Sequence, residues 1–115
     1  TNEVWHGNIT HNLNEMAEQA DLYYALWRPY RLHPDFPKFY DDEEEYEFEK
    51  NHHMKAKDIL PHLKKGLKKL KSNPEKYKKY NPKNGWGSYD GLVNFVEEYL
   101  KFCKEYPESV IEISR

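Results

Sequence analysis

The sequence predicts an α+β fold in which three main helices pack on a small sheet formed by the N- and C-terminal strands. Apolar side chains recur every three or four residues in 56–70 and in 92–103, which is the spacing of helices that bury one face. Short segments at 4–11 and 110–114 have the composition of strands, and each needs the other as a ladder partner. A length of 115 residues predicts a single domain, residues 1–115.

The composition lies near the boundary between folded and disordered chains. Hydrophobic residues make up only 37% of the sequence, but aromatic residues reach 16% and the net charge is −2. Disordered chains are usually poor in aromatic residues and carry a high net charge. We therefore expect a folded domain whose core depends on aromatic side chains more than on aliphatic ones.

The first part of the chain predicts a strand and then a long helix. The strand should cover residues 4–11. Asn12 then predicts a helix N-cap, and Glu15 completes a capping box. The helix should end before Pro29, because the residue that precedes a proline avoids helical backbone angles. Its apolar positions are Leu13, Met16, Ala17, Ala20, Tyr23, Tyr24 and Trp27.

Residues 28–53 predict an irregular segment. Three prolines interrupt it, and seven acidic residues lie within 41–49. A structureless stretch of this length is unusual inside a compact domain and is more often an inserted functional loop. We interpret about residues 30–52 as an inserted irregular loop, acidic and aromatic in character, whose order the sequence leaves open.

The second helix should span residues 55–72, with lysines opposite its apolar stripe. Pro61 fits only the first turn of a helix, so either Asp58 caps a later start or the helix kinks at the proline. Gly66 should cost about 1 kcal/mol relative to alanine in a helix. Residues 74–80 predict one further helical turn.

The last part of the chain predicts a helix followed by a strand. Turn-forming residues fill 81–87, and Ser88 should cap a helix that continues to Glu105. Pro107 ends this helix, and residues 110–114 predict the second strand. A two-stranded sheet is marginally stable unless it is covered. Pairing of its edge with a second copy of the chain, as a homo-oligomer, therefore stays open.

Charge is strongly segregated in the middle of the chain. Residues 41–49 contain seven acids and no base, whereas residues 55–79 contain ten lysines against Asp58 and Glu75. The simplest interpretation is two solvated faces that attract each other. Alternatively, the acidic run mimics a nucleic acid or docks on a basic partner, or the lysine run binds phosphates. The lysine run contains no arginine, which specific phosphate sites favour, so we do not expect nucleic-acid binding.

The sequence lacks the patterns of an enzyme, a metal site or a cofactor site. Its six histidines show no metal-ligand spacing, and no nucleophile is accompanied by an acid–base pair. The single cysteine, Cys103, lies on the apolar stripe of 92–103, as a buried structural residue does. No apolar run is long enough to cross a membrane and no signal-peptide pattern occurs, so we expect a cytoplasmic protein without a membrane partner.

Predicted helix starts, two arginines and two tryptophans suggest a ligand-binding cleft. Polar groups converge where helices begin, and arginine beside indole rings suits a small anionic or nucleotide-like ligand. The candidate ligand-binding residues are His11, Asn12, Arg28, Asn84, Trp86, Ser88, Tyr89 and Arg115. The competing interpretation is that Asn12 and Ser88 only cap helices and that the tryptophans only fill the core. The preferred function is a non-enzymatic protein that binds this ligand.

Five short motifs stand out along the chain: Asn8-Ile9-Thr10-His11-Asn12, Leu26-Trp27-Arg28-Pro29, Ala56-Lys57-Asp58-Ile59-Leu60-Pro61, Asn84-Gly85-Trp86-Gly87-Ser88-Tyr89 and Glu112-Ile113-Ser114-Arg115. Together they resemble a family of small uncharacterised proteins encoded by phages and bacteria. The resemblance implies a compact domain with about residues 30–52 as an appendage, and a phage setting in the host cytoplasm. Small phage proteins often block a host component. This motivates a second hypothesis, a protein-interaction module or an inhibitor of a host factor that acts through the acidic aromatic loop at 39–49.

Overall fold

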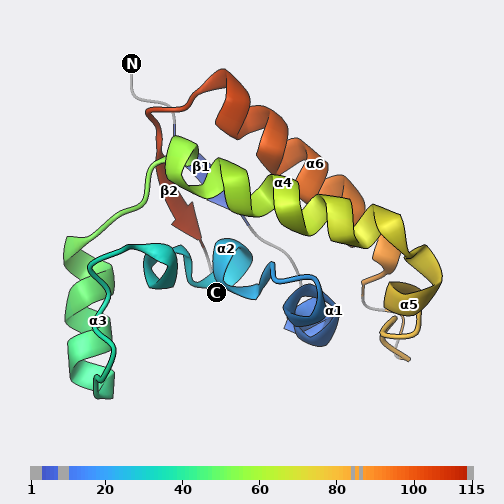
Figure 1. The fold of residues 1–115 in the computed structure, drawn as a ribbon, viewed down its shortest axis with the longest axis horizontal. Coiled ribbons are helices and arrows are strands. Elements are labelled where there is room, and N and C mark those ends of the chain that lie inside the picture. Colours follow the sequence, from blue (N-terminus) through green and yellow to red (C-terminus); the bar gives the residue numbers. More distant parts are fainter. Residues whose placement is uncertain (1–3, 8–10, 84, 86, 114–115) are drawn as a thin grey trace.

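The fold is that of a computed structural model that describes residues 4–7, 11–83, 85 and 87–113 (Figure 1). Two short 3₁₀ turns, η1 (His11–Leu13) and η2 (Pro29–Leu32), accompany the helices and strands. The helices and strands are, in chain order, β1 (Val4–Gly7), α1 (Asn14–Gln19), α2 (Tyr23–Trp27), α3 (Asp42–Asn51), α4 (Ala56–Ser72), α5 (Pro74–Lys78), α6 (Tyr89–Glu105) and β2 (Val110–Ile113).

The long helices α4 and α6 pack side by side and form the largest contact between elements (Figure 1). β1 and β2 pair in parallel, with Val4 opposite Val110 and Gly7 opposite Ile113. The predicted α+β class, with helices packed on a sheet, is wrong, because most of the described residues are helical and the long helices bury their stripes against each other. A 17-residue helix is about 25 Å long and a four-residue strand about 13 Å. The strand pair is therefore too small to be the layer on which the helices pack.

The core is built mainly from aliphatic side chains. The buried positions of α4 and α6 fall on the two predicted stripes and include Ile59, Leu63, Leu92 and Val96. The buried aromatic residues in the described part of the chain are Trp27, Tyr30, Tyr77, Tyr89 and Tyr99. All five phenylalanines are only partly buried or exposed. The expectation of a core that depends more on aromatic side chains is therefore wrong, because the helix stripes themselves are aliphatic.

The predicted N-terminal helix is broken into α1 and α2 by a reversal at Asp21. The backbone of Asp21 lies in the left-handed region, with φ of 59°. The N–H of Leu22 donates to the carbonyl of Ala17 at 2.8 Å, which is the hydrogen bond of a Schellman helix end. A continuous helix across 12–28 is therefore wrong. The predicted Asn12 cap is wrong as well, because α1 begins without a side-chain cap.

The C-terminal half follows the prediction more closely. α4 begins at Ala56 and continues through Pro61, so the later start is wrong. The carboxylate of Asp58 instead accepts a hydrogen bond from the backbone N–H of Lys55 at 3.3 Å. The short helix α5, the Ser88 cap, α6 and the second strand are confirmed. At the other end, β1 covers only the beginning of the predicted first strand, and residues 8–10 lie outside the described residues.

A helix, α3, forms where the sequence predicted an irregular loop. Asp41 caps it, because its carboxylate accepts a hydrogen bond from the N–H of Glu44 at 2.8 Å. Acidic residues fill its first turn, where they interact favourably with the positive end of the helix dipole. The prediction of irregular structure for about residues 30–52 is wrong for this part. Helix α3 projects from one end of the molecule and contains no buried residue (Figure 1).

Candidate functional site

The structure describes only half of the predicted ligand-binding side chains. Asn84, Trp86 and Arg115 lie outside the described residues, and so does the side chain of His11. Asn12 is exposed within η1. The remaining three are Arg28, Ser88 and Tyr89, and they lie in two separate parts of the fold.

Ser88 and Tyr89 have structural partners at the beginning of α6. The hydroxyl of Ser88 accepts a hydrogen bond from the N–H of Gly91 at 3.0 Å and caps the helix. The hydroxyl of Tyr89 donates to the carbonyl of Leu70, near the end of α4, at 2.7 Å. Burial raises the pKa of Tyr89, so the phenol stays protonated and keeps donating. The contact of Ser88 agrees with the competing interpretation, in which Ser88 only caps a helix, and the contact of Tyr89 also serves the fold.

Arg28 lies toward the other end of the molecule. Its guanidinium donates to the hydroxyl of Tyr30 at 2.8 Å and lies 3.7 Å from the carboxylate of Glu45 on α3. The beginning of α6 packs beside α5, and α3 and α5 stand at opposite ends of the molecule (Figure 1). The described members of the predicted cleft therefore do not converge, and the assignment of those residues to a ligand stays a prediction.

The contacts of Arg28 lead to a different site, which we call the acidic arm and define as residues 39–51. Glu45 fixes the arm to the body of the protein. One oxygen of its carboxylate accepts hydrogen bonds from Nε of Arg31 and from the hydroxyl of Tyr30, both at 2.8 Å. The same oxygen lies 2.6 Å from Nη2 of Arg31. The Glu45 side chain is only 14% exposed, so this carboxylate is the main polar link between α3 and η2.

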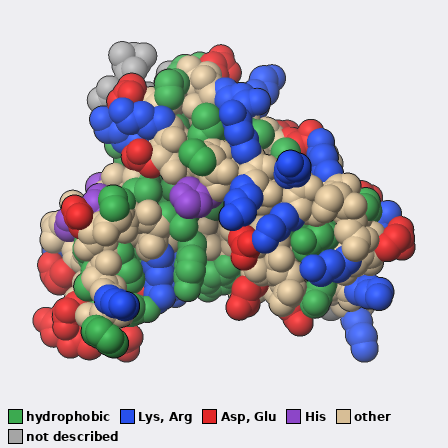
Figure 2. Space-filling model, viewed as in Figure 1, with side chains coloured by type: hydrophobic (Ala, Val, Ile, Leu, Met, Phe, Trp, Pro, Cys, Tyr) green, Lys and Arg blue, Asp and Glu red, His purple; other side chains and the backbone are tan. Residues whose placement is uncertain are grey.

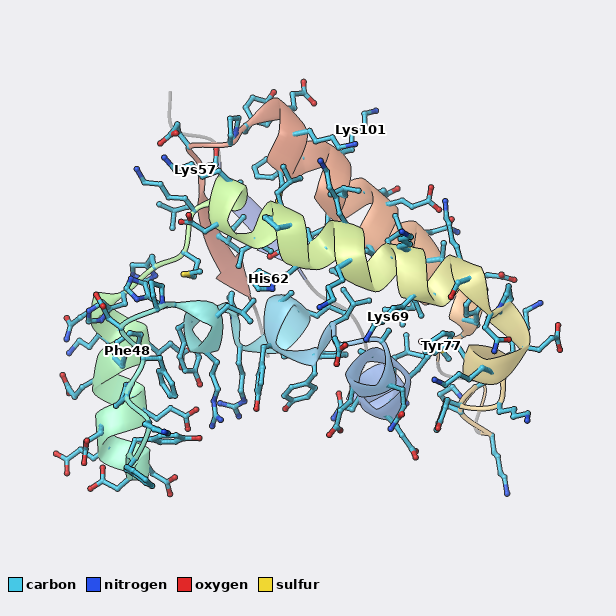
Figure 3. All side chains as sticks on the ribbon, in the orientation of Figure 1. Phe48, Lys57, His62, Lys69, Tyr77 and Lys101 are labelled. Carbon is cyan, nitrogen blue, oxygen red and sulfur yellow. The ribbon has the colours of Figure 1, made fainter. Side chains whose placement is uncertain are left out.

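Aromatic rings complete the contact between the arm and η2. Phe48, labelled on α3 in Figure 3, meets Phe36 edge to face with ring centroids 5.1 Å apart, and stacks on His52 at 3.9 Å. The guanidinium of Arg31 lies over the ring of Tyr40, 4.8 Å from its centroid. Aromatic pairs of this kind contribute about 0.5–1.5 kcal/mol each. The arm is thus held by the ion pairs of Glu45 with Arg28 and Arg31 and by a few rings rather than by a buried core.

The groups that fix the arm have the electrostatics of a structural ion pair. Burial acts to raise the pKa of Glu45, but hydrogen bonds from Tyr30 and Arg31 outweigh it and leave the pKa below its ordinary value of 4.5. Burial acts to lower the pKa of Arg31, and the hydrogen bond to Glu45 outweighs it and raises the pKa. Burial and the bond to Glu45 raise the pKa of Tyr30. Glu45 and Arg31 therefore keep their charges near neutral pH, and Tyr30 stays a neutral hydrogen-bond donor.

The outer face of the arm is acidic and carries two exposed rings. Phe39 is 86% exposed and Tyr46 is 63% exposed. The exposed acids around them are Asp41, Asp42, Glu43, Glu44 and Glu47. Figure 2 shows acidic and hydrophobic side chains together at the tip of this projection.

The acidic arm does not face the lysine run. Within the described residues no ion pair joins the acids of 41–49 to the lysines of 55–79. The lysines at the start of α4 pair with Glu108, and lysines farther along it pair with Asp21 and Glu97. The described residues therefore give no direct contact between the two charged faces, and the attraction between them stays a prediction. The exposed acids of the arm, Asp41, Asp42, Glu43, Glu44 and Glu47, face solvent.

The described part of the chain contains neither a reactive thiol nor a cluster of metal ligands. Cys103 is buried, and burial raises the pKa of its thiol to about 12, so a nucleophilic thiolate does not form near neutral pH. The described residues contain no cluster of three or more His, Cys, Asp or Glu side chains that could hold a metal ion. Among them, no helix has the length and hydrophobicity needed to span a bilayer.

Comparison with protein-family models, curated proteins and solved structures finds no match for this chain. The resemblance to small phage and bacterial proteins therefore stays a prediction. A signal for α3 was present in the sequence, because Asp41 with Glu44 three residues later and Lys50 near the end is typical of a capped helix. The contact between Arg31 and Glu45 had no such signal, since it joins residues across an irregular turn.

Proposed function

We propose that this chain is a non-enzymatic interaction module that docks its acidic arm on a basic, partly apolar surface of a partner protein. The exposure of Phe39 and Tyr46 carries the proposal, because the same arm also exposes five carboxylates. Single exposed rings are ordinary on protein surfaces. Two rings on a projecting element without a buried residue contribute little to folding, and aromatic side chains are frequent anchors of protein interfaces.

The charge of the arm indicates the kind of partner. Residues 41–49 contain seven acids. Glu45 is paired with Arg28 and Arg31, and five of the other acids are exposed. Opposite charge on a partner accelerates encounter and selects against partners of like charge. A basic protein surface is thus the expected docking site, and affinity should fall as salt screens the charges.

The way the arm is fixed supports this use. A ten-residue helix such as α3 is marginal on its own in water. The Glu45–Arg31 ion pair and the rings of Phe36 and Phe48 hold it in place before any partner arrives. A surface ordered in advance loses less conformational entropy on binding. The contacts made by the inward face of α3 therefore keep its outer face ordered for binding.

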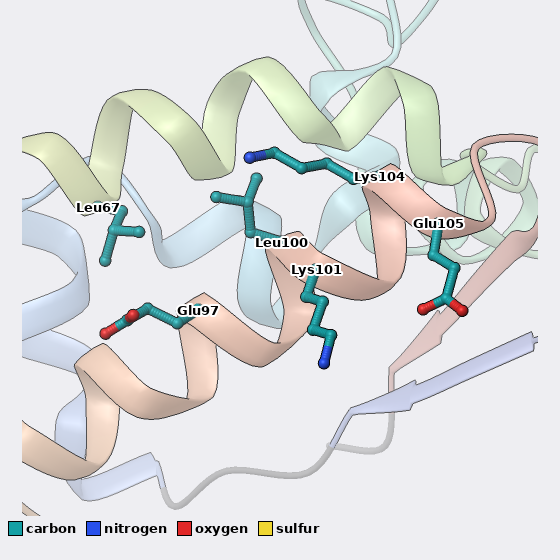
Figure 4. Close-up of a pocket in the computed structure, with 6 residues that line it drawn as sticks. All are labelled: Leu67, Glu97, Leu100, Lys101, Lys104 and Glu105. Carbon is teal, nitrogen blue, oxygen red and sulfur yellow. The ribbon is translucent and has the colours of Figure 1, made fainter.

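The hypothesis of an anionic ligand finds less support in the described hollows. A recess between α1, α2, η2 and α4 is lined by carboxylates and tyrosines rather than by arginines. The groove between α4 and α6, with a volume of about 480 Å³, has Leu67 and Leu100 beside two lysines and two glutamates (Figure 4). Charges of both signs are balanced there. Neither hollow has the excess of positive charge that an anion site requires.

The experiment compares the chain with the double variant Phe39→Ser/Tyr46→Ser. Both forms are used to capture proteins from a bacterial lysate, which is chosen because the motif resemblance indicates a phage setting. Each captured protein is then purified and titrated against both forms, since capture alone does not show direct contact. We expect a basic protein that binds the unaltered chain directly and binds the variant about tenfold or more weakly, as for an interface hot spot.

The matched control is Tyr106→Ser, which removes an exposed ring outside the arm. Tyr106 is 37% exposed and follows the end of α6. This control should bind the partner as the unaltered chain does, and all forms should have the same circular dichroism spectrum. An equal loss in the control and the double variant would contradict the proposal. Direct binding that does not weaken as salt rises would contradict the assignment of a basic partner.

A further inference from the structure

A recess between α1, α2, η2 and α4, which we call the α2 recess, has a volume of about 370 Å³. Figure 3 shows His62 extending from α4 toward α2, and Figure 2 shows hydrophobic side chains gathered in the hollow between the arm and α1. Ligand pockets usually range from roughly 300 to 1,000 Å³, so this recess suits a small group. Its lining side chains are Glu18, Asp21, Tyr23, Tyr24, Leu32 and His62.

The reversal at Asp21 builds the aromatic wall of the recess. Its left-handed backbone ends α1 and turns the chain directly into α2, so two tyrosines follow closely after Glu18. The rings of Tyr23 and Tyr24 meet edge to face, with centroids 5.7 Å apart and planes at 71°. The faces of aromatic rings carry partial negative charge, so this wall attracts cations.

Carboxylates lie beside the aromatic wall. Glu18 is exposed, and in the described part of the chain no side chain neutralises it. A side-chain hydrogen bond from Lys69 holds the pKa of Asp21 below its ordinary value of 3.8, so Asp21 is also ionised near neutral pH. The carboxylate of Asp21 is thus balanced by Lys69, and the carboxylate of Glu18 is available to a cation that enters the recess.

The molecule itself already places a guanidinium against this wall. The central carbon of the Arg31 guanidinium lies 5.4 Å from the centroid of the Tyr24 ring. The Tyr24 side chain nevertheless stays 43% exposed, so a large part of it faces solvent. A ring that holds one cation and remains this exposed is suited to contact a second cation from the recess.

We infer that the α2 recess binds a guanidinium or ammonium group carried on a short apolar stem. The tyrosine faces and Glu18 attract the cation, and Leu32 packs against the stem. Such a group occurs both in a free small amine and in a basic side chain of a partner protein. The inference does not rest on the acidic arm, because no lining residue belongs to residues 39–51.

The test titrates three probes into the intact chain while tyrosine ring signals are followed by NMR. Agmatine represents a free amine, N-acetyl-arginine methylamide represents a side chain in a protein, and N-acetyl-citrulline methylamide is the uncharged isostere. We expect at least one guanidinium probe to bind about threefold or more tightly than the citrulline probe. Stronger binding of agmatine assigns the recess to free amines, and stronger binding of the arginine probe assigns it to side chains. Equal binding of the citrulline probe, or no response to any probe, overturns the inference.

Two matched variants locate the binding. Glu18→Gln should weaken the better guanidinium probe about threefold, as loss of an exposed ion pair does. Glu15→Gln should leave it unchanged, because Glu15 is exposed on the same helix and does not line the recess. Equal affinity of Glu18→Gln and the unaltered chain overturns the role of the carboxylate. The Phe39→Ser/Tyr46→Ser variant should bind the probes normally, so failure of the arm proposal and failure of this one are distinguishable.

Discussion

Glu45 shows how one side chain can position a helix that has no core of its own. Four partly buried residues of the arm and its end, Glu45, Phe48, Glu49 and His52, recur at the spacing of one helix face. Glu45 is the acidic member of this face that binds Arg31 and Tyr30. The acids Asp42, Glu43 and Glu44 lie in the first turn of α3 and stabilise its N-terminus, and Glu47 faces solvent. The same residue type therefore has two different roles within one turn of the helix.

Acid should release the arm from the body of the protein. Burial acts to raise the pKa of Glu45, but the hydrogen bonds from Tyr30 and Arg31 lower it below 4.5. A carboxyl group whose pKa is lower in the docked state stabilises docking fully at a pH above its pKa in the undocked arm. This stabilisation is lost as the pH falls through the pKa of the group in the docked arm. Nuclear Overhauser effects between the rings of Phe36 and Phe48, 5.1 Å apart, should be present at pH 7 and weaken progressively as the pH falls below about 4.5.

Two variants test whether Glu45 causes this transition. Glu45→Gln should weaken the ring contacts already at pH 7 and remove their dependence on acid, because the amide does not titrate in this range. Glu47→Gln should behave as the unaltered chain, since Glu47 is exposed on the outer face of α3. Ring contacts whose dependence on acid is the same in Glu45→Gln and in the unaltered chain would show that the aromatic packing, and not the ion pair, fixes the arm.

At the scale of elements, the sequence predicts best those helices whose extent follows from a local pattern of apolar residues and caps. α4 and α6 follow from apolar periodicity, and Ser88 marks the beginning of α6. The break between α1 and α2 was missed because the left-handed position is filled by Asp21 instead of the usual glycine. α3 was missed because its acids were interpreted only as a charge run. The two hollows and the Arg31–Glu45 pair depend on contacts between distant residues, which no local pattern encodes.

Gly66 in α4 is a position where packing should outweigh helix propensity. A Cβ at this position would collide with the side chain of Leu22, which is fully buried and has no room to move. Alanine is preferred to glycine in a helix by about 1 kcal/mol. We nevertheless expect Gly66→Ala to lower the free energy of unfolding by about 1–3 kcal/mol, the usual effect of overpacking a core. Urea denaturation followed by circular dichroism measures it.

The partner and a neighbouring exposed position give the controls for Gly66. In a Leu22→Ala background the collision is absent, so Gly66→Ala should be neutral or stabilising, and the two substitutions should be strongly non-additive. Lys65→Ala, at the exposed neighbouring position, should change stability by no more than about 0.5 kcal/mol. A stabilising effect of Gly66→Ala in the unaltered chain would mean that α4 and the α1–α2 turn are less tightly packed than the structure shows.

At the scale of the whole molecule, stability and recognition are assigned to different parts. The body buries the stripes of α4 and α6 together with α1, α2 and Ile111 near the start of β2. In the arm, α3 contains no buried residue, and the arm carries the two most exposed rings, Phe39 and Tyr46, beside five exposed acids. This separation explains why composition alone placed the chain near the disorder boundary. The average combines an aliphatic helical body with a charged appendage.

Hydrogen exchange should resolve the same two parts. Protection from exchange follows the free energy of local opening, which grows with the number of buried apolar contacts. Amides in the middle of α4 and α6 should therefore exchange most slowly, and those of α3 about tenfold or more faster after correction for intrinsic rates. Glu45→Gln should accelerate exchange in α3 and leave α6 unchanged. Equal protection of α3 and α6 would instead make the arm part of the cooperative core, and Phe39 and Tyr46 would then lie on a rigid face of the body instead of on a separable docking element.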